Sequence, residues 1–346
     1  METAQKISSR HRRIRELYYI THIDNIPSIL KRGVLSHESI HAAGIHFKHV
    51  YNEDIVGKRK EIKAPNGKSL WTFANLYLNA RNPMLYKLKC DGLLKNIAIL
   101  GISPEILNHE DIYVTTGNAA NTQTDILPIS IARKILPKIV KETDRAYWRE
   151  EDGSKRKIMA ECLVPDVVPP DFIKSIYVAS YETIYKIKET TNFSVFIRQP
   201  DMFFQPSKTI QLTSHLSLVE GDMFFSRMQT LTVSVNIVRI MGKGVASRAK
   251  YQFPDVYVRY QDVCRNGQLR MGKPYLYKRE ASADLELADE PLTLLEPNFE
   301  TWFLLFATKR HWRDQADIQG IEKGLQWICD NYKKEGIKGL AVPALG

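Results

Sequence analysis

A single carboxylate set among apolar residues is the feature of this sequence best suited to chemistry. Glu161 lies in the run IMAECLV, and this pattern predicts a buried or half-buried strand. A charged side chain in such a strand costs roughly several kcal/mol unless it is paired or used. The alternative is a carboxylate on the solvent face of the strand, bonded to Arg156 or Lys157. The pattern alone leaves both interpretations open.

The turn after the first predicted strand offers a second group of polar side chains. Residues 17–22, LYYITH, predict a strand, and Asp24 or Asn25 can cap a following helix that ends at Gly33. A helix N-terminus beside a strand end offers backbone N–H groups to an anion or an amide. His22 lies at this junction, where it could hydrogen-bond a ribose hydroxyl or act as a structural histidine.

Histidine is concentrated in the segment that follows. A metal site is one interpretation, since two of these histidines would share a helix face, but Gly44 interrupts the segment and no acidic or cysteine ligand lies at a convincing spacing. We therefore expect no metal and instead a loop that closes over a ligand. The four histidines are His37, His41, His46 and His49.

Basic and aromatic residues come next. Such a basic run is usually a solvated face, but an arginine that enters a cleft can hold a pyrophosphate with two hydrogen bonds. Tyr77 and Tyr86 could stack on planar rings, although burial is the usual role of tyrosine. The polar loop at residues 114–126 lacks a core pattern, and long loops of this kind often bind something. The basic run contains Lys58, Arg59, Lys60 and Lys63.

The second half of the chain combines a strand, a glycine loop and a helix. Gly242 and Gly244 follow a β-rich run and precede an amphipathic segment. Glycine lets backbone N–H groups approach phosphate oxygens, and the helix dipole favours the negative charge. The loop matches neither GxxxxGK[ST] nor GxGxxG, so it is a weak nucleotide signal by itself. The alternation of strands and helices predicts an α/β sandwich.

Length and composition set the outer limits. A chain of 346 residues fits two domains, and prolines near residues 200–208 place the expected boundary between a first domain, 1–207, and a second, 208–346. The formal charge of +10 favours a polyanionic partner. We expect a cytoplasmic protein with no membrane partner, because no apolar run is long enough to span a bilayer and the basic start is not followed by an apolar signal segment. Four dispersed cysteines argue against a zinc ribbon or a disulfide framework.

The first half of the chain resembles the DarT family of toxins, which ADP-ribosylate bases in single-stranded DNA with NAD as the donor. The resemblance implies an α+β ADP-ribosyltransferase-like fold, a split mixed sheet with NAD across its cleft. It covers roughly residues 12–180 and rests on four motifs in family order: THIDN at 21–25 with Gly33, IVGKR at 55–59, NLYLNARNPMLY at 75–86 and KRKIMAECLVPDVVPPDFI at 155–173.

The same resemblance implies roles for individual residues. Glu161 is the expected catalytic carboxylate, Arg59 the catalytic and phosphate-contacting arginine, and the loop at 114–126 the substrate-recognising loop. A carboxylate can stabilise the oxocarbenium character that develops as nicotinamide leaves, and a base must be unstacked to be attacked, which favours single strands. The expected contacts to NAD, which is a substrate and needs no metal, come from His22, Ile23, Asp24, Asn25, Gly33, Arg59 and Tyr77.

The second half resembles a macrodomain, in particular that of DarG, the antitoxin that removes ADP-ribose from DNA. The resemblance implies an α/β three-layer sandwich and Lys309 as the catalytic lysine. ADP-ribose is expected to meet Asp222 at the adenine, Asn236 at the distal ribose, and Gly242, Lys243 and Gly244 at the diphosphate. The matching motifs are EGD at 220–222, VN at 235–236, MGKG at 241–244, FPDVY at 253–257, TKRHWR at 308–313 and VPALG at 342–346.

Three departures from the macrodomain pattern affect this half. Arg239 stands where the family usually has glycine, Ala249 stands where it has an aromatic residue, and the sequence stops at Gly346, before a second glycine loop and a final helix. We therefore expect a macrodomain that is incomplete at its C-terminus, and its hydrolase activity stays open.

These observations predict a toxin–antitoxin fusion with a contact between its two domains. The first domain is expected to transfer ADP-ribose from NAD to a base of single-stranded DNA, thymidine in the first place, and the second to bind or remove DNA-linked ADP-ribose. One alternative is a catalytically silent fusion that binds ADP-ribose or nucleic acid. Another is a transferase that acts on guanine, RNA or protein.

Overall fold

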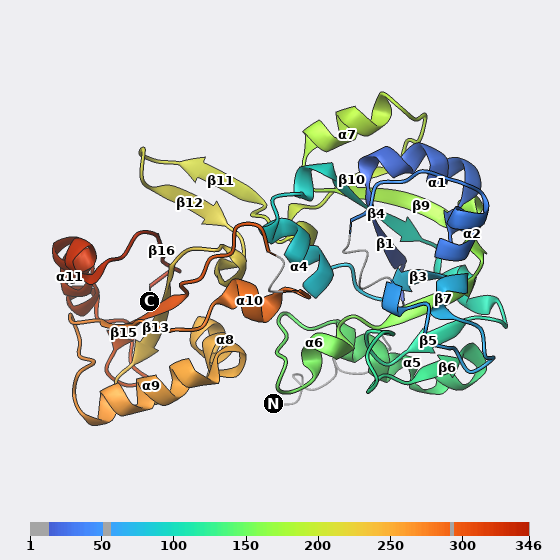
Figure 1. The fold of residues 1–346 in the computed structure, drawn as a ribbon. Coiled ribbons are helices and arrows are strands. Elements are labelled where there is room, and N and C mark those ends of the chain that lie inside the picture. Colours follow the sequence, from blue (N-terminus) through green and yellow to red (C-terminus); the bar gives the residue numbers. More distant parts are fainter. Residues whose placement is uncertain (1–13, 51–56, 291–293, 346) are drawn as a thin grey trace, which may run out of the picture. The chain divides into compact units, whose positions relative to one another are not determined.

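The computed structural model describes residues 14–50, 57–290 and 294–345, and the chain divides into two compact units, Met1–Phe203 and Phe204–Gly346 (Figure 1). Phe203 is fully buried, and the ring of Phe204 packs on Phe225 with centroids 4.8 Å apart. Two adjacent phenylalanines therefore lie at the division, slightly before the boundary expected after residue 207. Three parts of the sequence discussed above lie outside the described residues: residues 10–13 of the basic start, residues 55–56 of the IVGKR motif, and Gly346.

The first unit is built on an eight-stranded mixed sheet with the strand order β10-β9-β4-β1-β3-β7-β5-β6. The pairs are antiparallel except that β10 runs parallel to β9. Glu161 is the first residue of β7, in the interior of the sheet. The strands are β1 (Leu17–His22), β3 (Phe73–Tyr77), β4 (Ile97–Ile102), β5 (Tyr113–Thr115), β6 (Ile126–Pro128), β7 (Glu161–Pro165), β9 (Ile173–Val178) and β10 (Phe196–Arg198).

Both strands predicted in the first unit are present: residues 17–22 form β1, and the apolar run around Glu161 forms β7. All six residues of β4 are buried, as expected for a central strand with both faces covered. In β7 the first four residues are buried, so Glu161 enters the sheet with apolar neighbours on both sides. The fold expected from the family resemblance, an α+β unit with a mixed sheet, is confirmed.

Helices and 3-10 turns connect these strands. Side-chain caps begin several of the helices: the Asn82 amide oxygen accepts the N–H of Leu85, and the Ser36 hydroxyl accepts that of Ser39. The helices are α1 (Ile26–Arg32), α2 (His37–Ala42), α4 (Pro83–Cys90), α5 (Ile129–Thr143), α6 (Ser154–Lys157) and α7 (Tyr181–Lys188). The 3-10 turns are η1 (Ile23–Asn25), η2 (Leu70–Thr72), η3 (Leu94–Asn96), η4 (Pro104–Asn108), η5 (Pro170–Phe172) and η6 (Pro200–Phe203).

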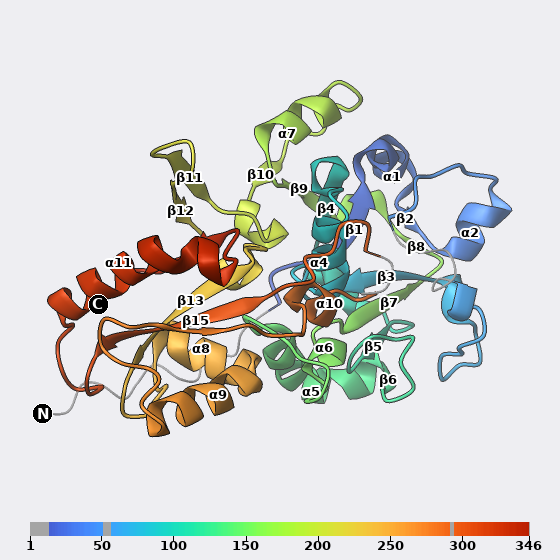
Figure 2. The same cartoon turned by 60° about the vertical axis from the view of Figure 1, so that its left-hand side comes forward.

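The second unit has three layers around a four-stranded sheet with the order β14-β15-β13-β16. Figures 1 and 2 show α11 (Ile318–Glu335) on one face of this sheet and α8 (Gly244–Gln252) and α9 (Pro254–Arg265) on the other. The predicted macrodomain-like sandwich is therefore confirmed. Its remaining elements are β13 (Thr230–Asn236), β14 (Tyr275–Tyr277), β15 (Trp302–Lys309), β16 (Leu340–Ala341), α10 (Ala283–Leu287), η7 (Met223–Phe225) and the hairpin of β11 (Lys208–Gln211) and β12 (Ser217–Glu220).

Within the described ranges, no helix is both long enough and apolar enough to cross a bilayer.

Gly33 joins α1 to a short ladder formed by β2 (Val34–Leu35) and β8 (Val167–Val168). Its backbone has φ 86° and ψ −179°, a combination that is essentially restricted to glycine. A Cβ at this position would lie 2.2 Å from the carbonyl oxygen of Val168. Close backbone packing alone is therefore sufficient to require glycine here.

We expect Gly33→Ala to lower the free energy of unfolding by several kcal/mol, on the order of 3, because strain in φ and ψ adds to a backbone clash. Gly67→Ala is the matched control, since Gly67 also has positive φ, 81°, but nothing within 4 Å of an added Cβ. That control should lose only about 1 kcal/mol. Chemical denaturation of both variants measures the difference, and equal losses would contradict the close-packing argument.

Candidate functional site

Glu161 and Arg59 form a buried two-point ion pair in the first unit. Arg59 Nη2 donates to Oε2 at 3.0 Å and Nη1 to Oε1 at 3.3 Å, while Glu161 is 1% exposed and Arg59 9% exposed. Two parallel charge-assisted bonds fix the guanidinium in the plane of the carboxylate. The solvent-face alternative for Glu161 is therefore wrong. The two residues that were expected to carry the chemistry lie together.

A backbone donor completes the surroundings of the carboxylate. The N–H of Ala119, in the polar loop after β5, donates to Glu161 Oε1 at 3.1 Å. The N–H of Glu161 itself donates to the Thr115 hydroxyl at 2.8 Å, and that hydroxyl donates to the carbonyl of Gly117 at 2.6 Å. The loop expected to recognise substrate is thus connected to Glu161 twice: the Ala119 N–H bonds the carboxylate, and the Thr115 hydroxyl bonds the backbone N–H.

Arg156 holds the same loop from the other side. Its carbonyl accepts the N–H of Asn118 at 2.9 Å, and its Nη1 donates to the Thr124 hydroxyl at 3.1 Å. A Cβ on Gly117 would lie 2.7 Å from Arg156 Nη1, so the loop backbone packs directly on the guanidinium. Arg156 was considered as a partner for Glu161 on the solvent face. The structure gives it the role of positioning the loop.

Tyr77 lies on β3 directly opposite Glu161 on β7. Its side chain is 8% exposed, and its hydroxyl donates to the sulfur of Met84 at 3.2 Å. The ring is therefore held in place beside the carboxylate strand.

The His22–Asn25 turn anchors a second loop and does not cap α1 as predicted. The Asn25 side chain makes no cap bond; its Oδ1 accepts the N–H of Lys48 and its Nδ2 donates to the Lys48 carbonyl, both at 2.8 Å. His22 instead caps the preceding 3-10 turn η1, where its Nδ1 accepts the N–H of Asp24 at 3.1 Å. The capping prediction failed because a distant backbone segment satisfies Asn25 better than the local N–H groups do. Ile23 packs its side chain in the core.

Burial lowers the pKa of His22. The Asp24 carboxylate acts in the opposite direction, and the Lys48 ammonium again lowers it. The Lys48 ammonium also pairs with Asp24 at 3.0 Å. Neutral His22 keeps an acceptor nitrogen for the Asp24 N–H, which is the tautomer that the cap requires.

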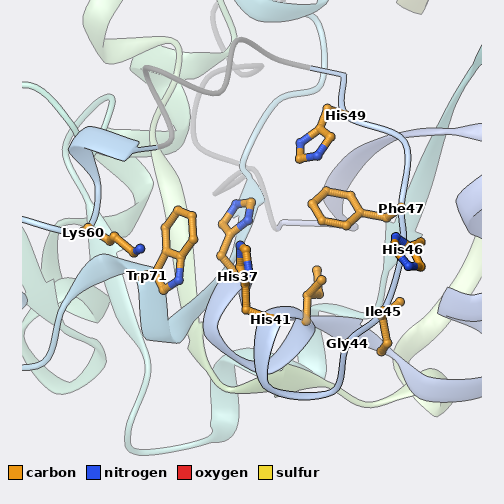
Figure 3. A pocket seen from close by; sticks show the side chains of 10 residues that line it. His37, His41, Gly44, Ile45, His46, Phe47, His49, Lys60 and Trp71 are labelled. Carbon is orange, nitrogen blue, oxygen red and sulfur yellow. The ribbon is translucent and has the colours of Figure 1, made fainter.

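The loop that Asn25 holds forms one wall of a pocket of about 540 Å³ (Figure 3). On the opposite wall His37 stacks on Trp71 with centroids 4.6 Å apart, and the Lys60 ammonium lies 4.9 Å from the Trp71 ring on its other side. The ring of Phe47 lies 6.4 Å from that of His37. The remaining lining comes from Ile40, His41, Gly44, Ile45, His46 and His49.

Positive charge surrounds the histidines of this pocket. Burial in the first place, and then the charges of Arg59, His49 and His41, together lower the pKa of His37 to about 4. Lys60, which lines the pocket, directly follows Arg59 in the chain, so the pocket lies near the Arg59–Glu161 pair. Over the described ranges, no group of three or more His, Cys, Asp or Glu side chains is arranged to hold a metal ion.

In the second unit, Asn236 holds the glycine loop that follows it. Its Nδ2 donates to the Ile240 carbonyl at 2.7 Å, and its Oδ1 accepts the N–H of Val238 at 2.9 Å and the hydroxyl of Tyr260 at 2.8 Å. The amide expected at the distal ribose thus shapes the loop. Burial raises the pKa of Tyr260, so its hydroxyl stays a donor.

The other residues expected to hold ADP-ribose lie around the same end of the sheet. Lys309 ends β15 and pairs in register with Asn236 on β13. Gly244, with φ 58°, begins α8, and Gly242, Lys243 and Gly244 are all exposed. Asp222 accepts the N–H of Phe224 at 3.1 Å and lies 3.3 Å from Arg248 Nη2.

Arg239 has a left-handed backbone, with φ 67°. This conformation costs a residue with a Cβ about 1 kcal/mol more than glycine. It explains in physical terms why glycine is the residue expected at this position.

Comparisons with known proteins find similarity over both units. The family model described as ssDNA thymidine ADP-ribosyltransferase, DarT, matches residues 18–204. A DNA ADP-ribosyl transferase-DNA ADP-ribosyl glycohydrolase fusion protein of Thermosipho africanus is 57% identical over 337 residues, which cover 96% of this chain and 87% of that protein. The solved structure of Thermosipho africanus DarTG in complex with ADP-ribose is similar with a TM-score of 0.90 and 56% identity, and covers 96% of this chain and 87% of that one.

A second relative matches the second unit only. The DNA ADP-ribosyl glycohydrolase of Thermus aquaticus is 30% identical over 131 residues. The matched region is 38% of this chain and 32% of that protein, so the chain spans about a third of that relative.

The depressed pKa of His37 predicts a pH-dependent stability. In the unfolded chain His37 binds a proton as the pH falls through about 6.5, whereas in the folded protein it does so only near pH 4. The unfolded state therefore binds more protons between these values, and stability should fall as the pH is lowered from about 6.5 to 4. His37→Phe keeps a ring against Trp71 without the titration. Denaturation at pH 7, 6 and 5 should show a shallower loss of stability for this variant, and identical losses would contradict the assignment.

Proposed function

The chain belongs to the DarT family, in the form fused to a DarG macrodomain, and from this premise we propose that its first unit transfers ADP-ribose from NAD to thymidine in single-stranded DNA. The observation that carries the proposal is the enclosed Glu161 carboxylate, held by Arg59 and by the Ala119 N–H. Under this proposal the reaction takes place in the cytoplasm, where NAD and exposed single strands of DNA meet.

The geometry supports a definite division of roles. As the bond from the ribose C1′ to nicotinamide breaks, its electron pair leaves with nicotinamide and positive charge develops on the sugar. A carboxylate with few water contacts stabilises that charge strongly, because the surrounding medium screens it little. A nitrogen of the thymine base forms the new bond to C1′ and loses its proton.

Arg59 is suited to two tasks in this reaction. Its guanidinium stays protonated at any relevant pH and presents several donors in a plane, so it can hold the pyrophosphate of the donor. Its positive charge also favours a deprotonated nitrogen on the attacking base. The ion pair with Glu161 keeps the two groups in register before any ligand arrives.

The aromatic pocket supports the donor side of the proposal. Stacked Trp71 and His37 face the ring of Phe47, and heteroaromatic rings prefer such surfaces. The wall of the pocket is fixed to Asn25, in the motif that the family resemblance assigns to NAD. We therefore assign this pocket to the adenine end of NAD, with Tyr77 beside the nicotinamide and His22 at a ribose.

For the second unit we propose removal of ADP-ribose from DNA. Lys309 supplies an amine at the end of β15, beside the loop that Asn236 holds. Exposed backbone at the start of α8 suits the diphosphate, since a helix N-terminus attracts anions. The two units then catalyse opposing reactions on one DNA mark.

Glu161→Gln should lower the rate of transfer at least about 100-fold, because the charge that stabilises the developing cation is removed while the shape is kept. Glu105→Gln is the control, since Glu105 is an exposed glutamate in η4. Both are incubated with labelled NAD and a thymine-containing oligonucleotide, and the mass gain of one ADP-ribose is followed. Equal rates for the two variants, or no gain with the unmodified protein on any oligonucleotide, would refute the proposal.

Lys309→Ala should abolish release of ADP-ribose from a purified ADP-ribosylated oligonucleotide. Lys323→Ala, which changes an exposed lysine of α11, is the control and should release ADP-ribose at the unmodified rate. Both are made in the Glu161→Gln background so that no new mark is added during the assay. Release of ADP-ribose is followed by mass spectrometry. Unchanged release by Lys309→Ala would remove this lysine from the reaction.

A further inference from the structure

Helix α5 carries a stripe of lysines on its outer face. Lys134, Lys138 and Lys141 are exposed and lie four and seven positions apart, so they share one side of the helix. The buried residues Ala132 and Ile139 occupy the opposite side. With a rise of 1.5 Å per residue, the three charges cover roughly 10 Å along the helix. We call these three residues the α5 lysine stripe.

The stripe differs from four basic residues after the C-terminal end of α5, each of which has an acidic partner. Arg145, Arg149, Lys155 and Lys157 each lie between 2.6 and 3.8 Å from a glutamate oxygen. None of the stripe lysines has such a contact with any carboxylate of the described residues. Their charge is therefore not neutralised locally and is directed to the solvent.

Apolar side chains accompany the charges. Ile131 and Ile135 lie one turn apart on the flank of the stripe and are 54% and 37% exposed. Two exposed isoleucines one turn apart offer an apolar surface to the rings of nucleobases. Positive charge beside apolar surface is the combination that single strands require.

The position of α5 connects the stripe to the proposed reaction centre. The chain runs from Thr115, which bonds Glu161, through the loop of Ala119 and β6 directly into α5. The sheet order places β6 two strands from β7, and α5 contacts both β5 and β6. With strands about 4.8 Å apart, the helix begins within roughly 10 to 15 Å of the carboxylate strand.

We propose that the α5 lysine stripe binds the phosphates of the DNA strand beyond the target nucleotide. This inference rests on the proposed function and adds to it an extended, sequence-independent substrate site. The span of the stripe, roughly 10 Å, is long enough to contact two or three consecutive phosphates of a single strand. The strand then gains affinity from its length, while the base at Glu161 determines where the transfer occurs.

The test compares binding of DNA, without NAD, by the unmodified protein and by the triple variant Lys134→Gln, Lys138→Gln and Lys141→Gln. The probe is a labelled oligothymidylate of about 20 nucleotides, followed by fluorescence anisotropy between 50 and 200 mM salt. Loss of three phosphate contacts should lower the slope of log K against log salt by about two. Across this salt range the unmodified protein should therefore lose about 15-fold more affinity than the variant.

The matched control removes three exposed lysines from elements outside α5: Lys95 of η3, Lys174 of β9 and Lys188 of α7. It changes the net charge by the same amount and should leave the slope unchanged. Circular dichroism confirms that both variants are folded. A slope that falls equally in both variants, or in neither, would overturn the inference.

Transfer assays separate this inference from the proposed function. The stripe variant should need more of the long oligonucleotide to reach half-maximal rate, while its KM for NAD and its rate on a four-nucleotide substrate stay as they were. An equal loss on short and long oligonucleotides would overturn the inference. If the unmodified protein binds DNA through the stripe and yet transfers nothing, the proposed function fails and the DNA site stands.

Discussion

The buried ion pair of Arg59 and Glu161 is the interaction on which the first unit depends. Taking two charges out of water costs several kcal/mol per ion, and only close geometry with further hydrogen bonds offsets this cost. The carboxylate receives two bonds from the guanidinium and one from the Ala119 N–H. The Ser69 hydroxyl donates to the Arg59 carbonyl at 3.3 Å, so the backbone of the arginine is also held.

This pair fixes the surrounding loops in turn. Since Glu161 needs the Ala119 N–H, the loop of residues 116–125 must return to the sheet, and Thr115 and Arg156 hold its two ends. Under the proposed function, a pyrophosphate that binds Arg59 competes with Glu161 for the same donors, so binding of NAD weakens the hold of Arg59 on the carboxylate.

The strands and the central residues were accessible from the sequence because their signals are local. Local residue patterns predicted β1 and β7, and a lone carboxylate within an apolar run marked Glu161. The partners were not accessible in this way. The sequence around Asn25 is typical of a helix cap, yet its side chain bonds the backbone of Lys48. No local pattern predicts that the loop containing Lys48 returns to Asn25.

Arg156 and Asn236 show the same limit for side chains. Arg156 was considered as a partner of Glu161 because the two are close in sequence, but Arg156 lies in α6, where it packs tightly on Gly117 and bonds the loop. Asn236 carries a residue type suited to a ribose, yet its amide closes the turn to Ile240. Polar residues that hold a loop and polar residues that touch a ligand have the same composition, and only the fold distinguishes them.

In both units, side-chain hydrogen bonds hold the loops that the proposed function assigns to binding. In the first unit, Asn25 fixes the loop that contains Lys48, and Arg156 fixes the loop of residues 116–125. In the second unit, Asn236 and Tyr260 fix the glycine loop. A loop that is ordered in advance costs little conformational entropy on binding, so more of the contact energy appears as affinity. Arg239, strained in a left-handed backbone, persists because the bonds of Asn236 on either side of it impose the turn.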